Sequence, residues 1–273
     1  MEAKSRLNSC TNSISRWASI ILIGLILPGF VRAEEELNNG EDFTRPLNQF
    51  QLRYQYQEKS DDVDESTFIL RLDHPIPLSE NWKISTRFDL PFVLTDAVSA
   101  DNPGGETGFG LGDFLAQAAL IETVSDRFAW GSGFRWVFPT ASEDQFGTGK
   151  YQLVPFLGMR YSLPELSKGS FFQPIVRYDF SVAGDESRKD VSRFRFSPTL
   201  NIALPDRWYI TLYPSQDIVL NNIGGHNWFV PADFLIGRHL NQRIVTGLEI
   251  SIPIIKEFTL YDFKLEARLS YSF

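Results

Sequence analysis

The chain has 273 residues, of which 26 are lysine or arginine, 34 are aspartate or glutamate and one is cysteine. A formal net charge of −8 argues against nucleic acid as a partner, and a single thiol excludes an intrachain disulfide. The length suits one large all-β domain.

Residues 1–33 have the pattern of a secretory signal peptide. A basic segment with Lys4, Arg6 and Arg16 precedes the apolar run ASIILIGLILPGF and the small-residue motif VRA. A spanning helix needs about 20 apolar residues, so this run of thirteen, which contains glycine and proline, disfavours a membrane anchor. We predict cleavage after Ala33.

Loss of this peptide changes the charge and removes the thiol. Four of the 26 basic residues and one of the 34 acidic residues belong to this peptide. The exported chain therefore has 22 basic and 33 acidic residues, a net charge of −11. Cys10 leaves with the peptide, so the exported chain has no thiolate metal site. We expect no metal site and no cofactor.

Residues 34–47, EEELNNGEDFTRPL, show no periodicity. We predict that they form a periplasmic N-terminal extension. A location inside the domain that follows is the alternative.

From residue 48 onward the chain repeats segments in which apolar and polar side chains alternate. They are 49–57, 66–75, 82–92, 109–121, 127–138, 150–161, 172–182, 193–203, 207–217, 227–238, 243–253 and 264–273. Alternation indicates strands with two different environments on their faces. Strands of this length are typical of transmembrane barrels, whereas strands of soluble proteins usually have about 5–6 residues.

We therefore predict an all-β fold for residues 48–273, a transmembrane antiparallel β-barrel of about twelve strands in the cell outer membrane. An even number of strands places both termini in the periplasm. The short connections 122–126, 205–206 and 239–242 fit periplasmic turns, and the long polar segments 94–108 and 139–149 fit outer loops.

The apolar side of each strand then faces lipid and the polar side lines the lumen. The residues predicted to line the lumen and to influence solute selectivity are Arg53, Arg71, Arg87, Arg135, Arg177, Arg193, Arg195, Asp89, Asp113, Asp179, Glu249 and Glu266. Rows of opposite charge are expected on neighbouring strands. The charges either fill the barrel with ion pairs or form an electrostatic lining that selects solutes. Barrels of about eight strands are filled and those of about 16–18 are open, so twelve strands suit a narrow pore.

The chain ends on KLEARLSYSF, which alternates to its last residue. This segment is predicted to close the barrel by pairing with the first strand, so that no sheet edge meets lipid. Tyr271 and Phe273 resemble the C-terminal assembly signal of bacterial outer-membrane proteins, and barrel-assembly machinery is the partner that this implies.

No catalytic residues are assigned, and we predict that the protein is not an enzyme. The motif GFGLGD (108–113) lacks the lysine of a phosphate-binding loop, and its glycines more simply permit bending or close approach. An outer-rim lipid hydrolase is the least favoured alternative. It would depend on His226, with Ser215 some distance away along the chain.

Three stretches, GFGLGDFLAQAALIE, FPTASEDQFGTGKYQLVPFLGMRYS and NWFVPADFLIGRHLNQR, resemble the outer-membrane proteins of the MetA-pathway of phenol degradation family. The resemblance covers roughly residues 45–273. It implies a barrel that passes small, often hydrophobic or aromatic compounds, and it supplies no binding residues.

The combined prediction is an outer-membrane channel for passive passage of small solutes. Its partners are outer-membrane lipid and a small-molecule solute. A structural or adhesive barrel with a filled lumen is the main alternative.

Overall fold

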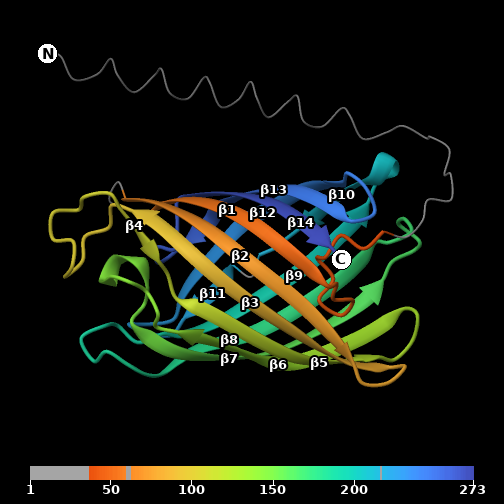
Figure 1. Cartoon of the computed structure of the whole chain (residues 1–273), viewed down its shortest axis with the longest axis horizontal. Coiled ribbons are helices and arrows are strands. Elements are labelled where there is room, and N and C mark those ends of the chain that lie inside the picture. The colour runs from red at the N-terminus through yellow and green to blue at the C-terminus, as the bar shows by residue number, and fades with distance from the viewer. Residues whose placement is uncertain (1–36, 60–62, 216) are drawn as a thin grey trace, which may run out of the picture. The chain divides into compact units, whose positions relative to one another are not determined.

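A computed structural model describes residues 37–59, 63–215 and 217–273, and within them a single antiparallel sheet closes on itself (Figure 1). The strands are β1 (Gln49–Lys59), β2 (Val63–Pro77), β3 (Trp82–Thr95), β4 (Gly108–Leu111), β5 (Phe114–Thr123), β6 (Phe128–Phe138), β7 (Lys150–Ser162), β8 (Phe171–Gly184), β9 (Ser192–Ala203), β10 (Trp208–Leu212), β11 (Ile218–Asn221), β12 (Asn227–His239), β13 (Ile244–Lys256) and β14 (Phe263–Ser272). Two short 3₁₀ turns, η1 (Asp144–Phe146) and η2 (Pro205–Arg207), lie in connections. The predicted signal peptide and residues 34–36 fall outside the described residues.

The fourteen strands make a barrel of twelve, because two of them are interrupted. β4 and β5 both pair with β3 on either side of a break at Gly112 and Asp113. β10 and β11 both lie between β9 and β12. β1 pairs with β14 over ten residue pairs and completes the ring. The predicted twelve-stranded antiparallel barrel is confirmed.

The predicted strand 207–217 is wrong beyond residue 212. The chain leaves the sheet at Tyr213, which has a left-handed φ of 52°, and rejoins it only at Ile218. Pro214 follows and cannot donate a backbone hydrogen bond to a neighbouring strand. The hydroxyls of Ser197 and Thr199 donate to the carbonyl oxygen of Tyr213 at 2.9 and 2.8 Å, and so satisfy the backbone group that the break releases.

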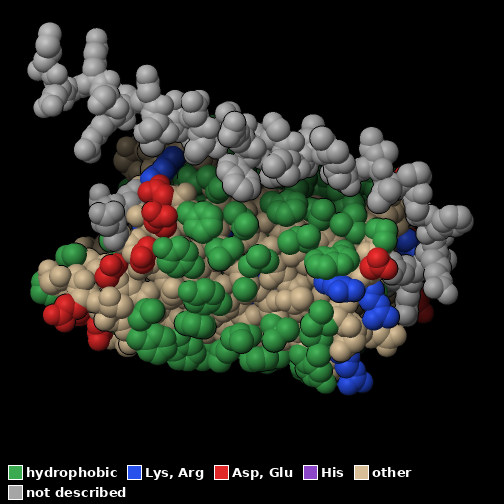
Figure 2. All heavy atoms as spheres, turned by 90° about the horizontal axis from the view of Figure 1, so that it is seen from above, with side chains coloured by type: hydrophobic (Ala, Val, Ile, Leu, Met, Phe, Trp, Pro, Cys, Tyr) green, Lys and Arg blue, Asp and Glu red, His purple; other side chains and the backbone are tan. Residues whose placement is uncertain are grey.

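Alternation along each strand separates an apolar outer face from a polar inner face. On β1, Phe50 and Leu52 are 44% and 41% exposed, whereas Gln49 and Gln51 are 3% and 4% exposed. Figure 2 shows hydrophobic side chains spread over the middle of the barrel wall. This inside-out distribution is what a hydrocarbon environment selects, because apolar side chains then need no burial within the protein.

The two ends of the barrel differ. Phe273 donates its backbone N–H to the carbonyl oxygen of Asn48 at 3.0 Å, so the barrel begins and finishes at one end, which we call the terminal end. The opposite end, the loop end, carries the connections 96–107, 139–149, 185–191, 222–226 and 257–262. In Figure 2 acidic side chains gather toward the loop end on the left and basic ones toward the terminal end on the right. Within the described residues, no helix is both long and apolar enough to cross a membrane.

The loop 139–149 is fastened to the barrel wall at the break between β4 and β5. Asp113 accepts hydrogen bonds from the backbone N–H and the hydroxyl of Thr148 at 2.7 and 2.8 Å. Phe146 is buried against Gly110, where a Cβ atom would lie 2.5 Å from the phenylalanine ring. A glycine is therefore required for this close approach, as the sequence motif indicated.

Candidate functional site

The barrel encloses a cavity of about 430 Å³. Its wall is formed by inward side chains of β1–β3, β5–β9 and β14. Pro214, Ser215 and Asp217, together with Gly40, Glu41 and Phe43, complete the lining. Eight basic and five acidic side chains line it. The cavity lies in the interior that the alternating pattern predicted to be polar.

Residues 37–47 contact the inner face of the barrel, and three of them, Gly40, Glu41 and Phe43, line the cavity. Phe43 packs edge-on against Phe156 of β7, with ring centroids 6.4 Å apart, and its backbone N–H donates to the side-chain oxygen of Gln173 at 3.0 Å. Asn39 donates to the amide oxygen of Asn201 on β9 at 2.9 Å, and Thr44 is fully buried. These described residues therefore contact inward side chains of β7, β8 and β9. We call them the inner segment.

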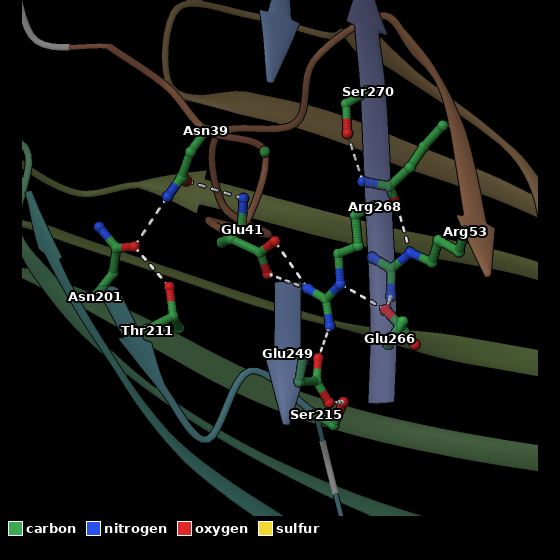
Figure 3. Close-up of polar contacts among 12 residues, drawn as sticks. Asn39, Glu41, Arg53, Asn201, Thr211, Ser215, Glu249, Glu266, Arg268 and Ser270 are labelled. Carbon is green, nitrogen blue, oxygen red and sulfur yellow. Dashed lines mark hydrogen bonds and ion pairs between the residues drawn. The ribbon is translucent and has the colours of Figure 1, made fainter. Parts of the chain in front are cut away.

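Two ion pairs hold the inner segment against the wall. Glu41 accepts two hydrogen bonds from Arg268 on β14, at 2.9 and 3.0 Å (Figure 3). Asp42 forms an ion pair with Arg160 on β7 at 2.9 Å. These contacts tie the segment to opposite parts of the sheet, so it is a structured part of the interior.

Buried charges on β13 and β14 form one connected network. Arg268 pairs with Glu41, with Glu249 and, at 2.5 Å, with Glu266. Lys264, which is fully buried, pairs with Glu249 at 2.7 Å and with Asp217 at 2.5 Å. A buried ion is tolerated only when its partners compensate for lost hydration, and every member of this network has at least one such partner.

A second row of ion pairs joins β2 to β3. Arg71 and Asp89 face each other in the register of β2 and β3 and share two hydrogen bonds of 2.6 Å. Arg87 pairs with Asp73 at 2.6 Å, two residues further along the same two strands. These pairs confirm the expected rows of opposite charge on neighbouring strands.

Nine of the predicted lumen residues line the cavity. They are Arg53, Arg71, Arg87, Arg135, Arg177, Arg195, Asp89, Asp179 and Glu266. Glu249 is also interior, but it is fully buried within the network of β13 and β14.

Arg193 and Asp113 lie outside the cavity lining. Arg193 stands opposite Asp179 near the loop end of β9. Asp113 lies at the interruption between β4 and β5, where its carboxylate holds loop 139–149.

Sequence reasoning missed Glu41 and Asp217 as lining residues. Glu41 belongs to the inner segment, which has no periodicity, and Asp217 lies in the break between β10 and β11. Glu41 lies outside the alternating segments. Asp217 is the last residue of the predicted segment 207–217, but the chain there has left the sheet after Leu212, so alternation identified neither residue.

The candidate hydrolase residues have separate partners. His226 is near Asn222 in the connection between β11 and β12, with 3.2 Å between the imidazole Nδ1 and the amide oxygen. Ser215 donates its hydroxyl to Glu249 at 2.6 Å within the interior network. In the described part of the chain, no cluster of three or more His, Cys, Asp or Glu side chains could hold a metal ion.

No family model and no curated protein matches the chain. The crystal structure of the COG4313 outer membrane channel from Pseudomonas putida F1 is similar with a TM-score of 0.65 at 14% identity, over 89% of this chain and 100% of that chain. KdgM porin in complex with disordered oligogalacturonate is similar with a TM-score of 0.49 at 11% identity, over 82% of this chain and 99% of that chain. Outer membrane phospholipase A from Escherichia coli is similar with a TM-score of 0.46 at 10% identity, over 85% of this chain and 93% of that chain.

The likeness to the COG4313 channel shows the fold of an outer-membrane β-barrel. Together with the apolar outer face, this fold assigns the chain to the outer membrane, in contact with its lipid. The resemblance to the MetA-pathway family is not supported by a family model and remains a hypothesis.

The interior network leads to a stability prediction for Lys264. Replacing Lys264 with methionine leaves Glu249 and Asp217 without the ammonium group that contacts both. Removing one partner of a buried ion pair costs about 3–5 kcal/mol, so the free energy of unfolding should fall by that amount. Urea unfolding in lipid vesicles, followed by tryptophan fluorescence, measures the change.

Lys256→Met is the matched control. Lys256 pairs with Asp262 at the loop end, where both side chains are partly exposed. Such a pair contributes about 0–1 kcal/mol. Equal losses in the two variants would show that the interior network does not stabilise the barrel.

Proposed function

We propose that the protein is a passive outer-membrane channel for small solutes, with the terminal end in the periplasm. The observation that carries the proposal is the cavity of about 430 Å³, lined mainly by charged and polar side chains, inside a closed transmembrane barrel. A hydrated interior of this kind provides a polar path through a layer that otherwise excludes polar solutes.

The inner segment narrows the path near the terminal end. Glu41 and Phe43 both line the cavity, where they contact Arg268 and Phe156 from opposite sides of the barrel. Passage is therefore restricted to small molecules. The resemblance to the MetA-pathway family favours hydrophobic or aromatic compounds among them.

A structural barrel with a filled lumen is the second candidate. The inner segment and the ion pairs favour it, because they occupy much of the interior. The two candidates differ in one measurable property, the ionic current through a single barrel.

Single-channel conductance in planar bilayers tests the proposal. The wild-type barrel should show small, discrete openings. The variant Glu41→Gln/Phe43→Ala should conduct more, because it loses both the ion pair with Arg268 and the packing on Phe156 that hold the inner segment against the wall.

Glu165→Gln/Phe172→Ala is the control for that experiment. Both residues are exposed, with Glu165 in the connection between β7 and β8 and Phe172 on the outer face of β8. Its conductance should match that of the wild type. Absence of current from the wild type and from the Glu41/Phe43 variant would instead support the structural barrel.

We also propose that Tyr271 and Phe273 are the signal read by barrel-assembly machinery. The backbone of Phe273 is tied to Asn48, while its side chain is 66% exposed and available for recognition. Deletion of Phe273 should lower the fraction of heat-modifiable, assembled barrel in outer membranes. Phe273→Trp should assemble normally, because it keeps a terminal aromatic side chain. Normal assembly of the deleted chain would rule out the signal.

A further inference from the structure

The wall of the cavity is chemically asymmetric. On the side of β1–β3 and β14, the inward charges are paired with one another. On the side of β5–β8, the lining includes a patch of apolar side chains, Leu115, Val137, Val154, Phe156 and Ile175. We call this patch the apolar wall.

Two arginines beside the apolar wall have no carboxylate partner among the described residues. Arg135 donates only to the side-chain oxygen of Gln117, at 3.0 and 3.3 Å. Arg177 is 7% exposed, lies over the ring of Phe156 at 5.5 Å and has an Nε with no hydrogen-bond partner. By contrast, Arg53, Arg71 and Arg87 each pair with a carboxylate.

The strand register brings these two arginines to the same part of the wall. Arg135 on β6 is opposite Val154 on β7, and Phe156 on β7 is opposite Arg177 on β8. Adjacent strands are about 4.8 Å apart, so the backbones of β6 and β8 are about 10 Å apart. Long arginine side chains can converge over that distance, with Val154 and Phe156 between them.

An uncompensated buried guanidinium is costly, and a carboxylate is its best partner, because two parallel N–H···O bonds can form. The apolar wall offers no hydrogen bonds and suits the hydrocarbon part of a ligand. The excess of basic over acidic side chains around the cavity favours anions over cations.

We propose that the cavity binds a small organic carboxylate with an apolar, aromatic-sized body. Arg135 and Arg177 hold the carboxylate, and Val137 and Val154 contact the body. This inference rests on the proposed channel function and names the class of solute that the channel takes.

Benzoate is the probe, and binding is measured by titration calorimetry on the full barrel in detergent micelles, which does not require conduction. Two matched probes separate the parts of the site: benzyl alcohol has the ring without the charge, and acetate has the charge without the ring. Benzoate should bind at least about tenfold more tightly than either. Equal binding of acetate and benzoate would overturn the role of the apolar wall.

The variant Arg135→Gln/Arg177→Gln should weaken benzoate binding at least about tenfold, because two charge-assisted contacts are lost. The control Arg127→Gln/Glu165→Gln removes an exposed ion pair that lies outside the cavity lining and leaves the net charge of the chain unchanged. The control should bind benzoate within about twofold of the wild type. Unchanged affinity in the Arg135/Arg177 variant, or an equal loss in the control, would overturn the assignment.

Two further measurements keep the test decisive. Heat-modifiable mobility on gels reports folding, and if the double variant does not fold, Arg135→Gln alone replaces it with the same expected direction. Single-channel recording is done in parallel with the titration. Benzoate binding without current would retain the site and overturn the channel, whereas current without benzoate binding would retain the channel and overturn the site.

Discussion

The fold depends on one constraint: within hydrocarbon, every backbone N–H and C=O must be hydrogen-bonded inside the protein. Closure of the sheet by β1 and β14 meets it, because every strand of the described residues pairs on both edges except the short β4, whose second edge is hydrogen-bonded to Ser142 at Leu111. Once the sheet is closed, its two faces have opposite environments, and period-two alternation becomes the dominant pattern of the sequence. At the interruption that begins at Tyr213, side chains of β9 satisfy the carbonyl group of Tyr213, and Asp233 accepts the backbone N–H groups of Tyr213 and Ser215.

Closure also concentrates charge. All polar faces point to one interior, so arginines and carboxylates from distant parts of the chain meet there with limited water. Pairs such as Arg71 and Asp89 follow from strand register, whereas the group around Arg268 brings together side chains of β13, β14 and the inner segment. The interior is thereby both stabilised by its ion pairs and left with two arginines, Arg135 and Arg177, that no carboxylate of the described chain neutralises.

Much of the fold and many of the lining residues could be predicted from the sequence, because apolar and polar side chains alternate along each strand. Alternation identified the strands and placed residues such as Arg53, Arg87 and Glu266 on the inner face, because side-chain direction in a strand is fixed by position. It placed Asp113 in the lumen lining, whereas that carboxylate lies at the break between β4 and β5 and holds Thr148, and it did not identify Asp217, which lies in the break between β10 and β11. The contact between Glu41 and Arg268 joins residues 227 positions apart, and no local pattern encodes such a pairing. Tyr213 breaks a stretch that alternates well, because its left-handed backbone is imposed by tertiary contacts.

Arg268 links the position of the inner segment to the charge that a passing ion meets. Its guanidinium contacts Glu41 from the segment and Glu249 and Glu266 from the wall. If the segment moves away, the wall keeps its own carboxylates but loses that of Glu41, so the local potential becomes more positive as the passage widens. The width of the cavity and the charge of its lining are therefore linked: a displacement of the inner segment that removes Glu41 would widen the cavity and make its lining more positive.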